Sequence, residues 1–223
     1  LAGILCDEGR VDEAIQVLVQ TFVNPGDEVV VLHPSYAMYR FYAEVAGATV
    51  TEVEYRIDDD LAFPLESLLR VLSDKTKAVF IANPNNPTGR AVSLQCIEQI
   101  LQIVPHAVVL IDEAYVEFSG ITALDFVRRY SNLFVSRTFS KAYGMAGLRC
   151  GCLISQPNNI AWSRKAQSPY SVNVVAAIAA SAAVSDTGWV AGYVRSVIES
   201  RTYLVGELRR LGIRQFPTDG NFV

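Results

Sequence analysis

Short apolar runs alternate along this chain with longer segments in which apolar residues recur every three or four positions. The short runs predict strands at residues 28–33, 49–54, 78–82, 107–112, 133–138 and 151–155. The longer segments predict helices at residues 12–22, 36–46, 64–72, 93–103, 122–130, 158–166, 173–185 and 187–211. Several of the strands are apolar at nearly every position, which is typical of a parallel sheet covered by helices on both faces.

The order of these elements predicts a three-layer α/β/α fold, with a mostly parallel sheet between two layers of helices. Residues 172–185 are apolar and alanine-rich, but the run is too short for a membrane span, so we expect a buried helix there. The long, amphipathic and charged segment 187–211 leads towards Gly212, where we expect a second domain to begin.

The length and the net charge of the chain favour a globular domain that does not bind nucleic acid. With 223 residues, of which 51% are hydrophobic, the chain can build one sizeable core, or one domain and part of another. The net charge of −4 disfavours nucleic acid as a partner, because no basic face is implied. No basic stretch followed by an apolar one is present at the N-terminus, so no signal peptide is predicted and we expect a cytoplasmic protein. Because the chain begins at Leu1 and stops as a new strand starts, we expect it to be part of a longer protein.

Cysteine and histidine spacing predicts no metal site. The four cysteines stand at positions 6, 96, 150 and 152, and no pair has the C-x-x-C spacing of a zinc site. The two histidines, at positions 33 and 106, are far apart in the sequence. Structural thiols in a reducing compartment are the favoured interpretation.

Polar and aromatic residues follow the predicted strands, and ligands of doubly wound folds bind at the carboxyl ends of parallel strands. Tyr36 follows the first strand and can either pack or stack on a flat ligand. The third strand leads into "NPNNPTG" (83–89), whose prolines and glycine predict a rigid, shaped loop with amide donors. The fourth strand ends at Asp112, either a helix N-cap or a carboxylate aimed at a positive ligand atom, with Tyr115 close behind.

The stretch "SRTFSKAYGMAGLRCG" (136–151) follows the fifth strand and contains one of only four lysines in the chain. Lys141 is either ordinary surface charge or a reactive amine beside an anion site. Thr138, Ser140 and Arg149 supply two hydroxyls and a guanidinium, a combination that can hold a phosphate group. A further helix begins near Val11, and a helix N-terminus offers free N–H groups to an anion, although any helix does so.

Taken together, "NPNNPTG", "DEAY" and "SRTFSKAYGMAGLRCG" resemble the motifs of pyridoxal-phosphate-dependent aminotransferases of fold type I. "DEAYVEF" and "RTFSKAYGMAGLRCG" are most similar to those of the histidinol-phosphate aminotransferases, and the resemblance extends over nearly the whole chain. It implies a seven-stranded, mostly parallel sheet and a large cofactor-binding domain over residues 1–188. Residues 189–223 would then form the interdomain helix and the start of a small domain.

The resemblance also implies how the cofactor ring is held. Lys141 would be the amine that forms the Schiff base with the aldehyde, and in a transaminase it also serves as general base and acid. Asp112 would pair with the protonated pyridine nitrogen. Asn86 and Tyr115 would hydrogen-bond the ring hydroxyl oxygen, and Tyr36 would stack on the ring face.

The phosphate group of the cofactor has its own implied partners. By the same resemblance, it would be held by Thr138, Ser140, Arg149 and the N–H groups near Val11 and Asp12. The family usually has small residues in the turn before this helix, whereas the chain reads "GRVDE" (9–13), so the phosphate-binding turn departs from the pattern.

The expected reaction is transamination between a small-molecule amino donor and a 2-oxo acid, most simply L-histidinol phosphate and 2-oxoglutarate, by a homodimer. By the resemblance, two family elements are expected outside the chain. One is an N-terminal arm whose tyrosine reaches the cofactor of the partner subunit, and the other is an arginine of the small domain, which binds the acidic group of the substrate. An aromatic aminotransferase or a threonine-phosphate decarboxylase would share all the cofactor residues, so these alternatives stay open. A domain of this fold that only binds a ligand, without turnover, would be free to lose Lys141 or Asp112. The chain has both residues, which counts against that alternative. No G-x-G-x-x-G follows a predicted strand, which counts against a dinucleotide-binding domain.

Overall fold

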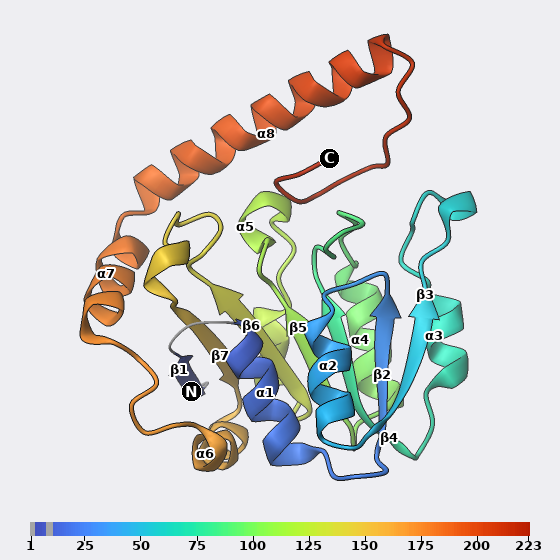
Figure 1. The fold of residues 1–223 in the computed structure, drawn as a ribbon, viewed down its shortest axis with the longest axis vertical. Helices are drawn as coiled ribbons and strands as arrows, with labels where there is room; N and C mark the ends of the chain where they lie inside the picture. Colours follow the sequence, from blue (N-terminus) through green and yellow to red (C-terminus); the bar gives the residue numbers. More distant parts are fainter. Residues whose placement is uncertain (1–2, 8–10) are drawn as a thin grey trace.

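The computed structural model describes residues 3–7 and 11–223, and Figure 1 shows a twisted sheet with helices on both sides. The strands are β1 (Gly3–Asp7), β2 (Glu28–His33), β3 (Thr49–Glu54), β4 (Thr76–Ala82), β5 (Val108–Asp112), β6 (Leu133–Thr138) and β7 (Gly151–Ser155). The α-helices are α1 (Val11–Phe22), α2 (Met38–Val45), α3 (Leu65–Val71), α4 (Leu94–Ile103), α5 (Val116–Ser119), α6 (Pro157–Ala166), α7 (Val174–Ser185) and α8 (Thr187–Arg210).

The sheet has the strand order β1-β7-β6-β5-β4-β2-β3. Neighbouring strands from β6 to β3 are parallel, and β7 runs antiparallel to both β6 and β1. The predicted α/β fold with a mostly parallel sheet is therefore confirmed. Six of the strands lie where the apolar runs predicted them, whereas the apolar pattern did not predict β1.

Two apolar layers lie on opposite faces of the sheet because successive residues of a strand point to opposite sides. On β4, Val79 and Ile81 pack in the layer covered by α3 and α4. Their neighbours Ala78 and Phe80 pack in the layer covered by α1, α2 and α6. This arrangement explains why β4 has no polar position between residues 78 and 82.

Two predicted helices differ in the structure. Residues 122–130 contain only a short 3₁₀ segment, Leu124–Arg128, because its N–H groups bond three residues back, as in Phe126 to Ala123. The apolar helix α7 is not buried, contrary to the prediction from its composition. Only its small-residue stripe, Ala176 and Ala180, packs on the loop that precedes β7, and Ile178 remains 66% exposed.

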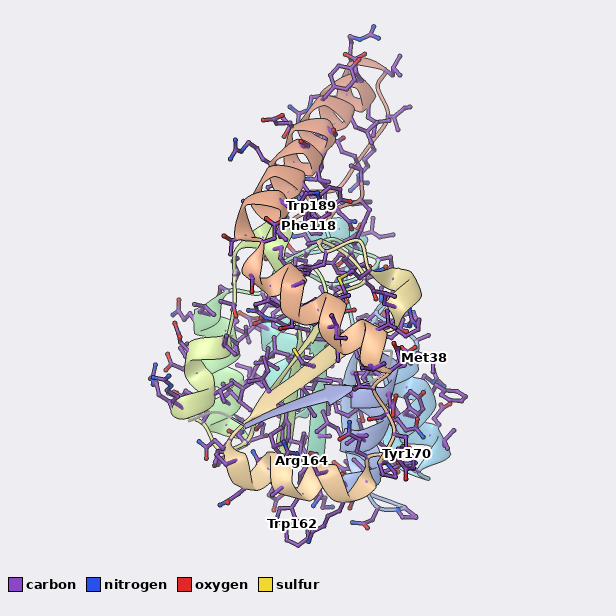
Figure 2. All side chains as sticks on the ribbon, turned by 90° about the vertical axis from the view of Figure 1, so that its left-hand side faces the viewer. Met38, Phe118, Trp162, Arg164, Tyr170 and Trp189 are labelled. Atoms are coloured by element: carbon purple, nitrogen blue, oxygen red, sulfur yellow. The ribbon has the colours of Figure 1, made fainter. Side chains whose placement is uncertain are left out.

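Some large aromatic side chains are exposed to solvent (Figure 2). Trp162 on α6 points away from the body of the molecule, and Tyr170 in the following loop is 87% exposed. In the described part of the chain, no helix is by itself long and apolar enough to cross a membrane. Helices α7 and α8 satisfy that test only as a pair, and they are bent by 79° at their junction.

The long helix α8 lies across the carboxyl ends of the strands (Figure 1). Three valines on one face of the helix, Val190, Val194 and Val197, pack against a small cluster around Tyr115. The segment after α8 returns to the sheet, where the N–H of Asp219 donates to the carbonyl of Gly89 at 2.7 Å. Helix α8 and the C-terminal segment therefore close one side of the region in which the strand-end motifs meet.

Candidate active site

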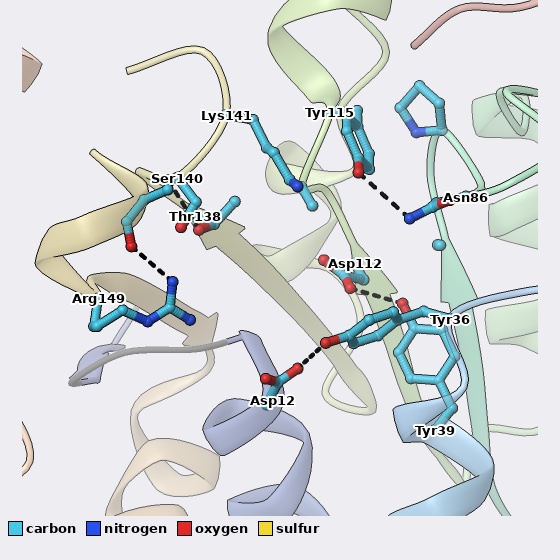
Figure 3. Close-up of a pocket in the computed structure, with 14 residues that line it drawn as sticks. Asp12, Tyr36, Tyr39, Asn86, Asp112, Tyr115, Thr138, Ser140, Lys141 and Arg149 are labelled. Atoms are coloured by element: carbon cyan, nitrogen blue, oxygen red, sulfur yellow. Dashed lines mark hydrogen bonds between the residues drawn. The ribbon is translucent and has the colours of Figure 1, made fainter. Parts of the chain in front are cut away.

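A cavity of about 200 Å³ lies at the carboxyl ends of the central strands (Figure 3). It is lined by Asp12, Tyr36, Tyr39, Ala82, Pro84, Asn86, Asp112, Ala114, Tyr115, Thr138, Ser140, Lys141, Ala146 and Arg149. The structure thus brings together all the predicted site residues except Val11. Val11 is the first residue of α1, and its side chain lies outside the described residues.

The inner end of the cavity is formed by Asp112, the last residue of β5, which is only 3% exposed. Its carboxylate accepts hydrogen bonds from Tyr39 Oη at 2.7 Å and from Ser136 Oγ at 3.0 Å. Burial raises the pKa of Asp112 to about 6, even though both hydrogen bonds act in the opposite direction. Asp112 is not the N-cap of the helix that follows, because the N-cap residue of α5 is Tyr115. A carboxylate held in this way can pair with a cationic ring nitrogen.

Tyr36 forms one wall of the cavity. Its ring meets the ring of Tyr39 edge to face, with centroids 5.7 Å apart, and its hydroxyl donates to Asp12 at the start of α1. Burial raises the pKa of Tyr36, and the hydrogen bond to Asp12 raises it further. The contact with the Tyr39 ring and the hydrogen bond to Asp12 together fix the orientation of the Tyr36 ring, which can then stack on a flat ligand.

The asparagines of the 83–89 loop divide into two roles. Asn83 and Asn85 are buried and fix the loop itself: Asn83 Oδ1 accepts the N–H of Val92 at 2.8 Å, and Asn85 Oδ1 accepts Ser35 Oγ at 2.6 Å. Asn86 alone of the three lines the cavity. The sequence predicted a rigid loop with amide donors, and the structure shows which asparagine is available to a ligand.

Tyr115 and Lys141 stand opposite the loop, near α8. Asn86 Nδ2 lies 3.4 Å from Tyr115 Oη, so the amide and the phenol can both hydrogen-bond the same ligand oxygen. The Tyr115 ring is buried against Phe222, with centroids 5.3 Å apart. Lys141 Nζ lies 5.2 Å from the centroid of the Tyr115 ring and also lines the cavity. An exposed amine therefore lies beside a buried phenol and the amide that bonds it.

Hydroxyl, N–H and guanidinium groups line another part of the cavity. The N–H of Ser140 donates to Thr138 Oγ1 at 3.1 Å, which fixes the turn that follows β6. Arg149 has a left-handed backbone conformation, with φ of 53°, and its guanidinium donates to the carbonyl of Ala146 at 2.7 Å. Non-glycine residues adopt this conformation rarely and often at functional sites. Together with Asp12 at the N-terminus of α1, these residues surround a place suited to a phosphate group, although the carboxylate of Asp12 is engaged by Tyr36.

The other lysines are remote from this cavity. Lys75 and Lys77 lie at the start of β4, the end opposite to the site, and Lys165 lies on α6 with its Nζ 3.6 Å from the centroid of the Trp162 ring. Among the described residues, Lys141 is therefore the lysine that lines the cavity.

Two features of the site are absent from the predictions made from sequence. Tyr39 is buried and bonds Asp112 although 73 positions separate the two residues. Behind the site, Arg137 forms an ion pair with the fully buried Glu113, with Nη2 2.8 Å from Oε2. Both residues of the ion pair stand next to cavity residues in the sequence, Asp112 and Thr138. That adjacency was the only signal available in the sequence, since it places Arg137 on β6 and Glu113 directly after the neighbouring strand β5.

The chain as a whole is similar to known proteins. The sequence pattern of "Aminotransferase class I and II" matches residues 9–223 of the chain. This chain belongs to the class I and II aminotransferase family. The family uses pyridoxal phosphate, and the amine, the carboxylate and the anion-binding groups of the cavity are what that cofactor requires.

Relatives within the family agree in fold and vary in substrate. A histidinol-phosphate aminotransferase of Thermoanaerobacter pseudethanolicus is 37% identical over 214 residues, which are 95% of this chain and 60% of that protein. The structure of a histidinol-phosphate aminotransferase from Sinorhizobium meliloti in complex with pyridoxal-5'-phosphate matches with a TM-score of 0.87, at 25% identity, over 97% of this chain and 59% of that one. An aspartate aminotransferase from Thermus thermophilus with maleate matches with the same TM-score at 26% identity, over 98% and 60% of the two chains. The chain thus spans about 60% of the length of the curated relative it matches.

Proposed function

We propose that this aminotransferase, in its full length, transfers the amino group of L-histidinol phosphate to 2-oxoglutarate and so acts in histidine biosynthesis. One observation carries the aminotransferase chemistry: Lys141, Asp112 and the Thr138–Ser140–Arg149 cluster line one cavity. Support for the substrate comes from the curated histidinol-phosphate aminotransferases that are about 37% identical to the chain.

The residues of the cavity fit pyridoxal phosphate. Asp112 would pair with the ring nitrogen, because a buried carboxylate with a raised pKa gains most from a cationic partner. Asn86 and Tyr115 would bind the ring hydroxyl, and the face of Tyr36 would lie against the ring. Phosphate would be held by the residues that can offer donors to it: Thr138, Ser140, Arg149 and the N–H groups of Val11 and Asp12 at the start of α1.

When bound, pyridoxal phosphate supplies an aldehyde that condenses with amines and a ring that takes up electrons. Lys141 Nζ would be the amine of the protein that holds the cofactor. With an amino donor bound, Lys141 Nζ would act as general base towards the proton on the donor's Cα and would later return a proton as general acid. Asp112 would favour a positive charge on the ring nitrogen, and Tyr36 would orient the ring. The exposed position of Lys141 leaves its side chain free to swing between these tasks.

The alternative is another amino-acid aminotransferase, an aromatic one for example, or a threonine-phosphate decarboxylase-like enzyme with the same fold. The likeness to an aspartate aminotransferase is the observation that keeps this alternative open. The reactions can be separated directly, since transamination consumes a 2-oxo acid whereas decarboxylation releases CO₂. We also propose, from the family resemblance, a cofactor-binding domain over residues 1–188, a second domain that begins within 189–223, and a cytoplasmic homodimer.

Covalent labelling tests the cofactor and the site. The purified protein is mixed with pyridoxal phosphate, its absorption spectrum is recorded, and borohydride is added before peptide mapping. We expect a pyridoxyl group on Lys141, with Lys165→Ala as a control that keeps the label and Lys141→Ala as a variant that loses it. A label confined to Lys75, Lys77 or Lys165 would overturn the proposed site.

Substrate choice is tested with the full-length protein. Initial rates are compared for L-histidinol phosphate, L-aspartate and L-tyrosine as amino donors, each with 2-oxoglutarate. We expect kcat/KM to be highest for L-histidinol phosphate. A higher value for one of the other donors, or CO₂ release without consumption of 2-oxoglutarate, would replace the proposed substrate by the alternative.

A further inference from the structure

Tyr39 connects two side chains that face the cofactor-binding cavity (Figure 3). It lies on α2 and is only 1% exposed. Its hydroxyl donates to Asp112 Oδ2 at 2.7 Å, and its ring meets the Tyr36 ring edge to face. On the side of the core, its ring rests on Phe80, with centroids 5.9 Å apart. Tyr39 therefore contacts both the carboxylate and the aromatic wall of the site.

The hydroxyl of Tyr39 keeps its proton throughout the pH range in which Asp112 ionises. Burial raises the pKa of Tyr39 well above its ordinary value, and the charge of Asp112 raises it further. The hydroxyl is thus a fixed donor, and it favours the charged form of its acceptor. The other groups that face Asp112 are Ser136 Oγ on β6 and the N–H of Ala114, which also donate to it, and the carboxylate of Asp12 on α1, which opposes its charge.

We propose that Tyr39 is a positioning residue that holds Asp112 ionised and aimed at the ring nitrogen of pyridoxal phosphate while bracing the ring of Tyr36. This inference rests on the proposed function, because Asp112 and Tyr36 matter in this way only where the cofactor binds. Tyr39 itself lies behind both residues and acts through them.

A purely structural tyrosine would be replaceable by phenylalanine at this position. Tyr39→Phe keeps the ring contacts with Phe80 and Tyr36 and removes only the oxygen that reaches Asp112. The chain offers a matched control in Tyr55, which is 6% exposed and whose buried hydroxyl has no hydrogen-bond partner among the described residues. Tyr55→Phe removes a buried phenol oxygen without removing a donor to Asp112.

The first measurement uses the cofactor-free protein and follows the carboxyl carbon of Asp112 by ¹³C NMR as a function of pH, with Asp112→Asn to assign the signal. A hydrogen bond to a charged group corresponds to about one to two pKa units, so Tyr39→Phe should raise the pKa of Asp112 by that amount. Tyr55→Phe should leave it within about 0.3 units of the parent protein, because it changes no donor to Asp112. An unchanged pKa in Tyr39→Phe would overturn the inference.

The second measurement adds pyridoxal phosphate and separates this inference from the proposed function. We expect Tyr39→Phe still to carry the borohydride-fixed label on Lys141, but to bind the cofactor about tenfold more weakly than the parent protein near pH 5, because below its pKa the ionised fraction of Asp112 falls tenfold for each unit by which that pKa rises. Label on Lys141 with parental affinity in Tyr39→Phe would refute the role of Tyr39 and leave the proposed function intact. Absence of label in the parent protein would refute the proposed function itself.

Discussion

Replacing Arg137 by alanine should destabilise the protein strongly, although Arg137 lines no part of the cofactor-binding cavity. Its Nε and Nη2 donate to Glu113 Oε2 at 3.0 and 2.8 Å, and Nη2 also donates to Thr122 Oγ1 at 2.8 Å. The Glu113 side chain has no exposed surface, whereas that of Arg137 is 28% exposed. The substitution therefore leaves a carboxylate in the protein interior without its counter-charge.

The expected loss follows from what remains around Glu113. Breaking a buried ion pair by removing one partner costs about 3–5 kcal/mol. Two neutral donors stay in place, the N–H of Ala123 at 2.6 Å and the hydroxyl of Thr122 at 2.8 Å. Because of these donors and the partial exposure of Arg137, we expect the lower end of that range, about 3 kcal/mol in the free energy of unfolding.

The loss should depend on pH in a defined direction. Burial raises the pKa of Glu113 above its ordinary 4.5, and the charge of Arg137 acts against that rise. Removing Arg137 therefore raises the pKa of Glu113 further. A group whose pKa is raised by folding contributes stability at low pH that is lost as the pH climbs through its pKa in the folded state. The destabilisation should thus be smallest below pH 4.5, where Glu113 is protonated in both states, and largest at pH 8.

Urea unfolding at a series of pH values measures this effect. Arg129→Ala is the matched control, because Arg129 is 59% exposed in its ion pair with Glu98 and solvent screens such surface pairs. A second variant, Glu113→Gln with Arg137→Met, removes both charges and should recover much of the loss. A destabilisation by Arg137→Ala that is equal at pH 4.5 and pH 8 would refute the reasoning, because it would show that an uncompensated charge is not its cause.

Further expected outcomes concern the loop before α4 and the carboxylate of the site. Gly89→Ala should lower stability by about 1–3 kcal/mol and raise hydrogen exchange in residues 216–223, because φ is +72° and the new Cβ would lie 2.3 Å from Thr218 Oγ1. Gly26→Ala, with φ of +88° and open space around it, should cost about 1 kcal/mol, and an equal loss in both variants would exclude the clash as a cause. Asp112→Asn removes the charge but also an acceptor, so its effect should be read as a change with pH: relative to the parent, the cofactor-free variant should gain up to about 3 kcal/mol in the free energy of unfolding between pH 3 and pH 8, since burial raises the pKa of Asp112 from 3.8 to about 6. Urea midpoints that differ by the same amount at both pH values would contradict this. Because the 223-residue chain spans about 60% of the length of the curated relative it matches, it should alone turn over more slowly than a protein of that relative's full length, and comparable rates would contradict this.

The sequence alone predicted six strands of the sheet and most of the residues that line the cavity. Strands such as Val108–Asp112 are apolar at nearly every position, and this pattern by itself indicates burial on both faces. The site motifs each follow a strand within a few residues, and parallel strands bring their carboxyl ends to one edge. Asp112, Asn86 and Lys141 could therefore be expected at one edge of the sheet from local information, and the resemblance of their motifs to a known family assigned them to one site.

Several predictions were wrong or missing where the outcome depended on packing between distant segments. Helix α7 has the composition of a buried helix, but only Ala176 and Ala180 contact the loop beneath it. Strand β1 has its only partner among the described strands in β7, far along the chain, and nothing in its own five residues indicates that pairing. Local patterns report how apolar a segment is, whereas burial depends on what the rest of the chain leaves uncovered.

The tertiary structure alone decided which residues support the catalytic groups. Tyr39 reaches Asp112 because the strand order β5-β4-β2 places α2, which follows β2, over the carboxyl end of β5. Arg137 meets Glu113 because β5 and β6 are neighbours in a register that pairs Asp112 with Ser136. Strand order and register arise from the packing of the whole sheet, so the roles of these residues follow from contacts that no short stretch of sequence contains.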